Sequence, residues 1–242
     1  MFTILLKDLT DFFNSLVAYI TIGIFLVVTG LFLWIFPDTS ILDYGYAGLD
    51  SLFNVAPYIF MFLIPAITMR SIAEERKEGT FELLATRPIT EWQIVLGKFL
   101  ASFCIVLFAL VPTFIYYFTV YELGITPGNI DTGAVIGSYI GLLLLGASFT
   151  SIGIFASSLS KNQIISFSIA VFLCFFAFSG FDSVSQLISL QSIGSYLTAL
   201  GINEHYQSIS RGVLDSRDLI YFLSFISFFL LFTHLILRRR KW

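Results

Sequence analysis

Residues 132–157 read TGAVIGSYIGLLLLGASFTSIGIFAS, and none of these side chains carries a charge. An α-helix rises about 1.5 Å per residue, so about 20 apolar residues cross the ~30 Å hydrocarbon core of a bilayer. The whole chain has a similar character, since 57% of its 242 residues are hydrophobic and only 12% are charged. A water-soluble domain of ordinary composition carries about twice that charged fraction. The sequence therefore predicts an all-α membrane protein.

Similar apolar blocks recur along the chain and predict six transmembrane helices within a single transmembrane domain, residues 1–242. We place the spans at Leu16–Phe36, Leu52–Met69, Phe99–Tyr121, Thr132–Ser157, Gln163–Phe181 and Leu219–Leu237. Six spans put both termini on one side, and most basic residues fall on that side: Lys7, Arg70, Arg76, Lys77, Arg87, Lys98, Lys161, Arg238, Arg239, Arg240 and Lys241. The positive-inside rule then predicts that both termini are cytoplasmic.

Residues 1–15, before the first span, have an amphipathic pattern. Their apolar side chains recur at helical spacing, whereas Lys7, Asp8 and Asp11 take the opposite face. Each Asp would cost about 2.5–3.5 kcal/mol at the bilayer centre, so an early start of the first span is disfavoured. We expect an interfacial helix that lies along the membrane surface.

Small residues form a face of the fourth span: Gly133, Gly137, Gly141, Gly146, Gly153 and Ser157. Such a face lets another helix approach closely, and packing within the same bundle is favoured over a dimer seam. Pro57, Pro65 and Pro112 lie in the second and third spans, where we expect kinks or local breaks.

Ionisable residues are rare in the six predicted spans, where His234 is the one side chain expected to titrate. Transporters driven by ion gradients usually keep an intramembrane carboxylate. A nucleotide-binding loop is also not expected: Gly97 and Lys98 resemble its end, but Trp92 and Phe99 stand where Gly and Ser or Thr are needed. If the chain moves a substrate uphill, a separate subunit must supply the energy.

Other functional classes have weaker support. Ser148, within a Gly-Ala-Ser-Phe run, and His234 resemble the serine and histidine of rhomboid proteases, which leaves an intramembrane hydrolase as a remote alternative. Cys104 and Cys174 fall inside apolar blocks and are expected to stay reduced. We expect no metal site and no cofactor, and the chain has no basic tract that would bind nucleic acid.

The longest loop on the cytoplasmic side, residues 71–90, reads SIAEERKEGTFELLATRPIT. Gly79 suits the end of a charged helix, and Thr80 can cap a short apolar helix that Pro88 ends. Thr90 and Gln93 form a capping box that starts the third span. A short apolar helix between charged flanks suits docking to a cytoplasmic partner, although it could instead lie on lipid headgroups.

At this loop the chain resembles the permeases of the ABC-2 class of ABC transporters. The resemblance rests on Glu75-Arg76, Gly79-Thr80, Glu82-Leu83-Leu84 and Pro88-Ile89, followed by Gly97-Lys98. It implies a coupling helix that docks onto an ATPase subunit through these residues: Glu74, Glu75, Arg76, Gly79, Thr80, Phe81, Glu82, Leu83, Leu84 and Pro88. It also implies no catalytic residues, a bacterial inner-membrane location, a second permease chain as partner, and scope for an auxiliary membrane subunit. More narrowly, the ranges 206–222 and 238–241 resemble the F subunit of gliding-motility-associated ABC permeases. A non-transporting membrane anchor remains the alternative.

Residues 182–218 connect the fifth and sixth spans on the outer side. Their apolar residues predict an amphipathic helix or re-entrant pair, followed by a second short helix from Asn203, as its N-cap, to Arg211. Asp215 is expected to cap the last span, and His205 is expected at the surface. The resemblance implies that these short helices form an external gate, and a structural lid is the alternative.

Overall fold

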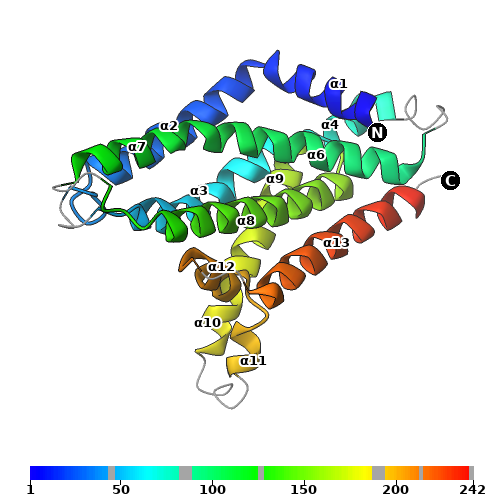
Figure 1. Cartoon of the computed structure of the whole chain (residues 1–242). Helices are drawn as coiled ribbons and strands as arrows, with labels where there is room; N and C mark the ends of the chain where they lie inside the picture. Colours follow the sequence, from blue (N-terminus) through cyan, green and yellow to red (C-terminus); the bar gives the residue numbers. More distant parts are fainter. Residues whose placement is uncertain (43–46, 82–88, 125–127, 187–193, 213–214, 240–242) are drawn as a thin grey trace.

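The computed structural model describes residues 1–242 except 43–46, 82–88, 125–127, 187–193, 213–214 and 240–242, and every regular element in the described residues is helical (Figure 1). The helices in the first half of the chain are α1 (Phe2–Phe13), α2 (Leu16–Trp34), α3 (Asp50–Thr68), α4 (Ala73–Lys77), α6 (Glu91–Leu110), the 3₁₀ turn η1 (Val111–Thr113) and α7 (Phe114–Leu123). In the second half they are α8 (Thr132–Leu159), α9 (Gln163–Phe175), the π-helical turn η2 (Phe176–Gly180), α10 (Phe181–Ser185), α11 (Gly194–Thr198), α12 (Ile202–Ser210) and α13 (Ser216–Arg239).

Six helical segments of the described chain are long and apolar enough to cross a membrane, as the sequence predicts. They are Leu16–Trp34, Asp50–Lys77, Glu91–Leu123, Thr132–Leu159, Gln163–Ser185 and Ser216–Arg238. The second and third extend well beyond their predicted limits, because charged turns at Ala73–Lys77 and Glu91–Lys98 continue the helical path past the apolar core.

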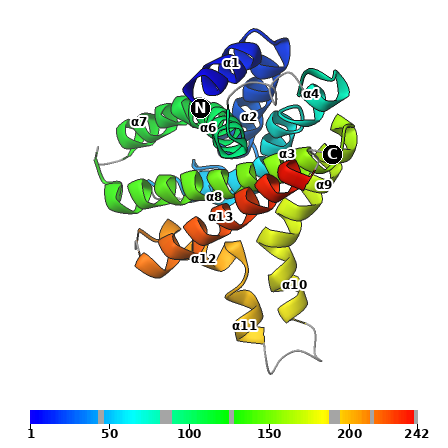
Figure 2. The same ribbon diagram turned by 90° about the vertical axis from the view of Figure 1, so that its right-hand side faces the viewer.

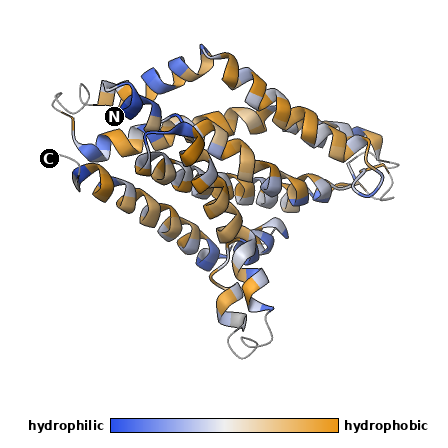
Figure 3. Cartoon of the chain, turned by 180° about the vertical axis from the view of Figure 1, so that it is seen from behind, coloured by the Kyte–Doolittle hydropathy of each residue, from blue (hydrophilic) through white to orange (hydrophobic). Residues whose placement is uncertain are grey.

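Both chain termini lie at the same end of the bundle, together with α4 and the start of α6 (Figure 1). Figure 3 shows hydrophilic residues gathered at this end, whereas the helices between the two ends are mostly hydrophobic. We call it the termini end, and we call the opposite end, where α2 ends and α8 begins, the distal end. The two ends of the chain lie together because six spans, an even number, return the chain to the side on which it started.

The long helix α8 is the centre of the bundle and packs against α3, α6, α9, α12 and α13. Its glycines allow these approaches. A Cβ atom on Gly146 would lie 3.1 Å from Val106 of α6, and one on Gly153 would overlap the Thr68 side chain of α3. In the described residues most of the small face thus packs inside the chain, as predicted, because Gly146 leaves room for α6 and Gly153 leaves room for α3.

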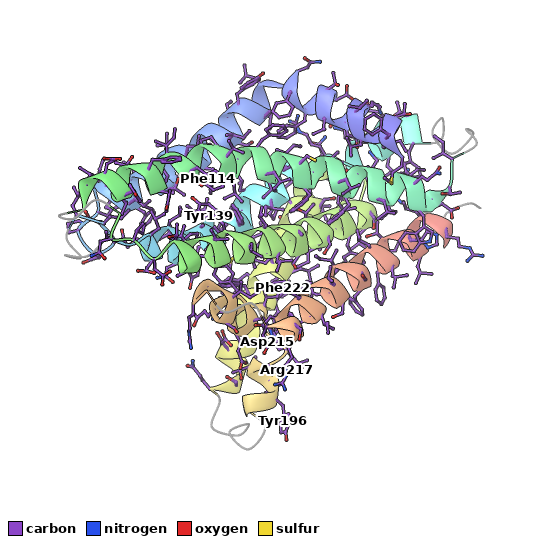
Figure 4. The ribbon with its side chains drawn as sticks, in the orientation of Figure 1. Phe114, Tyr139, Tyr196, Asp215, Arg217 and Phe222 are labelled. Carbon is purple, nitrogen blue, oxygen red and sulfur yellow. The ribbon has the colours of Figure 1, made fainter. Side chains whose placement is uncertain are left out.

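Pro112 interrupts the third span, as expected for a residue that lacks a backbone N–H. The α-helix ends at Leu110, and η1 leads into α7. The Thr113 hydroxyl donates to the Leu110 carbonyl, 2.6 Å away, and lies 3.1 Å from the Tyr139 hydroxyl of α8. Phe114 stacks on the same Tyr139 ring at 4.7 Å (Figure 4). The break therefore stays anchored to α8.

The helices α8 and α9 diverge from their short connection at Ser160–Asn162, and α12 lies in the opening between α8 and α10 (Figures 1 and 2). Three side chains of α12 are buried there: Ile202, Tyr206 and Ile209. The hairpin of α10 and α11 projects away from the bundle, with Tyr196 at its exposed tip (Figure 4). Of this segment, α12 therefore packs into the bundle, whereas α10 and α11 extend away from it.

Candidate functional site

The predicted docking loop lies at the termini end, and the structure describes its first part. Glu74, Glu75 and Arg76 are in α4, followed by Gly79, Thr80 and Phe81. The remaining members of the predicted docking set lie outside the described residues: Glu82, Leu83, Leu84 and Pro88. The capping box at Thr90 and Gln93 is present as predicted, and it starts α6.

Gly79 ends α4 as the sequence predicts, because its φ of +74° lies in the left-handed region that favours glycine. Thr80 is already helical, and its hydroxyl donates back to the Glu75 carbonyl at 3.3 Å. Lys77, Glu78 and Gly79 are the exposed residues of this described turn. A partner can reach these three residues without rearrangement.

Arg76 points into the protein, not outward. Its side chain is buried, donates to the Ser158 carbonyl at the end of α8, and lies over the Phe81 ring, 5.4 Å from the centroid. The neighbouring Ser157 hydroxyl accepts from the backbone N–H groups of Ile72 and Ala73, both at 3.0 Å. Two consecutive serines of α8 therefore hold both ends of the α4 turn.

Glu75 also points inward, with 12% of its side chain exposed. Its carboxylate lies 2.9 Å from Lys98 Nζ and 3.1 Å from Lys7 Nζ. Lys98 has 1% of its side chain exposed, lies 3.2 Å from Asp8 Oδ2, and donates to the Ser71 carbonyl at 2.6 Å. Lys7 and Asp8 belong to α1, Glu75 to α4 and Lys98 to α6, so one ion-pair cluster joins three elements that are far apart in sequence.

Burial changes the acid–base behaviour of α1 at this cluster. Desolvation raises the pKa of Asp8 above its usual 3.8, and the nearby Lys98 ammonium only partly opposes this shift. For Lys7, desolvation lowers the pKa, but the hydrogen bond and charge of Glu75 outweigh it and hold the pKa above 10.5. Lys7 is therefore cationic at neutral pH.

A cavity of about 390 Å³ adjoins the cluster, between α1, α3, α4 and α6. Its walls combine the paired charges with Arg70, Glu74 and Glu78 and with apolar side chains such as Ile105. The cavity shows that α1 does not seal completely against the bundle. Space for movement exists beside the ion pairs.

The ion-pair partners within the chain were not predicted. From the sequence, Lys98 is a basic residue on the side of the termini, an incomplete match to the end of a nucleotide-binding loop and part of the family resemblance, and Asp8 lies on a polar helix face. The one available signal was a lysine at the start of an otherwise apolar span. Spacing alone does not identify carboxylates 90 and 23 residues away, in Asp8 and Glu75.

A second polar cluster lies toward the distal end, where α12 meets α3 and α8. The Tyr206 hydroxyl donates to the Phe53 carbonyl at 2.6 Å, and the Ser138 hydroxyl donates to the Ser210 carbonyl at 2.8 Å. A Cβ atom on Gly137 would lie 2.8 Å from Gly212 Cα, so the two backbones are in contact. Gly212 has a φ of +83°, in the left-handed region that favours glycine, and closely follows the end of α12.

Two expectations for this region were wrong. Asn203 does not cap α12, whose N-cap is Gly201; Asn203 instead donates its amide to Asp182, 2.8 Å away, because its side chain faces α10. His205 is not an ordinary surface residue. It lies 2.7 Å from Asp218, 3.0 Å from the Ala199 carbonyl, and stacks on Tyr221 at 3.8 Å. Asp215 caps α13 as predicted, through the backbone N–H of Arg217 (Figure 4).

The residues that suggested a hydrolase form no catalytic pair. The buried Ser148 hydroxyl donates to the Leu144 carbonyl of its own helix. His234 lies 3.4 Å from Glu91 and stacks on Trp92 at 4.6 Å. The Ser148 hydroxyl thus makes its hydrogen bond within α8, and His234 connects the end of α13 to the start of α6. The hydrolase alternative has no support in this geometry.

Comparison with known proteins identifies the family to which this chain belongs. The model of a family described as "ABC-2 family transporter protein" matches residues 3–238. The chain is also similar to the "Probable multidrug ABC transporter permease YbhR" of Escherichia coli strain K12 and of Escherichia coli O157:H7, at 28% identity over 123 residues. That match covers 50% of this chain and 31% of the relative, so the chain aligns with less than a third of each curated protein. Because the family model matches nearly the whole chain, the chain belongs to the ABC-2 family of transporter proteins.

Proposed function

We propose that the chain is the membrane-spanning permease subunit of an ATP-driven transporter, with hydrolysis carried out by a separate ATPase. The observation that carries the proposal is the family match over residues 3–238, on a chain with six apolar helices. The family implies a bacterial inner-membrane protein that works with an ABC ATPase and a second permease chain. Both termini, and with them α4, would be cytoplasmic.

The docking surface in this proposal is the loop between α3 and α6. Phe81, with Leu83 and Leu84, supplies an apolar anchor for a groove of the ATPase, and Glu82 supplies a charge. Among the described polar residues, Lys77 and Glu78 are exposed, whereas Glu75 and Arg76 are held by Lys98 and Ser158. The internal contacts of Glu75 and Arg76 favour a role in transmitting the movement of the loop. A direct contact with the ATPase would require these side chains to turn outward.

At the other end, α12 would act as part of an external gate. It is the short helix between the diverging α8 and α10, and it is tied to α3 and α8 by Tyr206 and Ser138. The π-helical turn at Phe176–Gly180 precedes it, and such turns occur often at functional sites. Movement of α8 or α3 would therefore reach α12 directly.

The narrower assignment, to the F subunit of gliding-motility-associated permeases, is also part of our proposal. It rests on the range 206–222 and on the basic end at residues 238–241. Deletion of the gene in a gliding bacterium should abolish spreading on a surface. Normal spreading by the deletion strain would contradict this assignment, while the permease function would be unaffected by that result.

The permease function is tested by copurification in mild detergent with candidate ATPase subunits. The native chain should retain an ATPase, and Leu84→Asp should lose it, because a charge replaces part of the apolar anchor. Leu159→Asp, at an exposed position of the α8 end, is a control for an added charge at the same end of the bundle. Failure of the native chain to retain any ATPase would contradict the permease proposal, and retention without ATP-dependent transport would favour a membrane anchor.

A further inference from the structure

Lys98 occupies a position that stability alone does not explain. Its ammonium group is buried at the meeting point of three elements, with Asp8 from α1 at 3.2 Å, Glu75 from α4 at 2.9 Å and the Ser71 carbonyl at 2.6 Å. Replacing a buried ion pair by apolar residues of similar volume is often neutral or stabilising, because desolvation offsets the attraction. Such a cluster instead fixes the relative position of the helices, because Lys98 can make all three contacts only when α1, α4 and α6 are in this arrangement.

The preceding residue, Gly97, provides an independent observation at the same turn of α6. A Cβ atom placed on it would lie 3.1 Å from both Cβ and Cγ2 of Ile4, and 3.3 Å from the Met1 carbonyl oxygen. These contacts are tighter than ordinary van der Waals contacts, so a larger residue would push α1 away from α6. Gly97 therefore permits the approach of α1, and Lys98 holds it.

The loop is connected to the same cluster from its other side. Glu75 precedes Arg76, whose side chain reaches the end of α8, and the Ser157 hydroxyl accepts from the backbone of Ile72 and Ala73. A displacement of α4 by even a few ångströms must either break these contacts or carry α1 and α6 along. Charged contacts in a water-poor site are strong enough to favour the second outcome.

From these contacts we propose that Lys98 is a positioning residue that makes α1, α4 and the start of α6 move as one body when the ATPase displaces the loop. This inference rests on the proposed permease function and adds to it the residue through which the force passes. In this role Lys98 acts through Asp8 and Glu75. The 390 Å³ cavity beside the cluster gives α1 room for such movement.

The test separates positioning from mere stability. Lys98→Met leaves two buried carboxylates without their lysine and is expected to lower stability. The triple variant Lys98→Met, Asp8→Asn, Glu75→Gln removes both carboxylates that lose Lys98 and is expected to restore stability. Lys7, which then loses Glu75, has 49% of its side chain exposed and stays solvated. Lys98→Arg keeps the charge. Lys161→Met, at an exposed position in the α8–α9 connection, is the control for loss of a lysine.

The readout is the distance between two spin labels in the complete complex in nanodiscs, with and without ATP and vanadate. One label is placed at Leu6 of α1 and one at Leu235 of α13, both exposed, after Cys104 and Cys174 are replaced by Ser. The native complex, Lys98→Arg and Lys161→Met should show a nucleotide-dependent shift of the distance. The triple variant should keep the ATPase bound but lose the shift.

A triple variant that shifts as the native complex does would overturn the positioning role and leave the permease function standing. A triple variant that fails to bind the ATPase would also overturn it, because the cluster would then belong to the docking surface. If the native chain itself retains no ATPase, the proposed function fails and the positioning role fails with it. Failure of the positioning role and failure of the permease function are therefore distinguished by whether the native chain retains an ATPase.

Discussion

At the scale of single residues, polar side chains at the termini end bind groups from other segments of the chain. Ser157 accepts two backbone N–H groups from Ile72 and Ala73, which would otherwise be buried without partners at the α3–α4 turn. In the same way, Lys98 forms ion pairs with both Asp8 and Glu75. In each case a helix residue satisfies groups from a segment that the chain reaches only after folding.

Ser157→Ala should lower the free energy of unfolding by about 1–3 kcal/mol, because two buried donors lose their acceptor. Ser168→Ala, at an exposed position where the hydroxyl bonds only within α9, is the matched control and should change stability by less than about 0.5 kcal/mol. Both values can be measured by chemical unfolding in detergent micelles. Equal stability of the two variants would show that the Ser157 contacts are not formed.

The protonation of Asp8 gives a prediction for pH. Its folded pKa is raised above 3.8, so the folded protein holds this proton more tightly than the unfolded chain does. The contribution of Asp8 to stability therefore falls as pH rises from about 4 through the folded pKa. Removal of Lys98, which opposes the shift, should raise the pKa of Asp8 further. Carbon NMR of the labelled carboxyl group measures both values, and a lower pKa in Lys98→Met would contradict this account.

At the scale of elements, close helix packing at glycines is what places α12. Gly137 of α8 lies against Gly212, which follows α12, and Gly141 of α8 lies against Ile209 and Tyr206. The small-residue face is visible in the sequence and favours packing within the bundle, but its pattern does not identify the partner segment. The partner is the short helix between the fifth and sixth spans.

Gly137→Ala should destabilise the protein by about 1–3 kcal/mol, because the added Cβ would lie 2.8 Å from Gly212 Cα, backbone that cannot easily yield. Gly23→Ala is the matched control, since no atom lies within 4 Å of an added Cβ there. It should be neutral or slightly stabilising, because alanine favours the helix by about 1 kcal/mol over glycine. Thermal unfolding in detergent distinguishes the two, and equal midpoints would argue against the α8–α12 contact.

At the scale of the whole molecule, the start of α1, the end of α13 and α4 share one end, and the end of α2 and the start of α8 share the other (Figure 1). If the termini are cytoplasmic, Glu78→Cys should react with a membrane-impermeant maleimide only after the inner membrane is permeabilised. Asp38→Cys should react in intact spheroplasts. Both variants require replacement of Cys104 and Cys174, and the opposite labelling pattern would reverse the proposed orientation.

The number of spans, their approximate limits, the break at Pro112 and the caps at Thr90 and Asp215 all follow from the order of residues along the chain. These features depend on local physics: hydrophobic length, a missing N–H group and side chains that reach backbone two or three residues away. The position of α12 between α8 and α10, the His205–Asp218 contact and the Lys98 cluster depend on contacts between distant segments. No periodicity encodes which carboxylate meets which lysine, because that pairing arises only when the helices pack together.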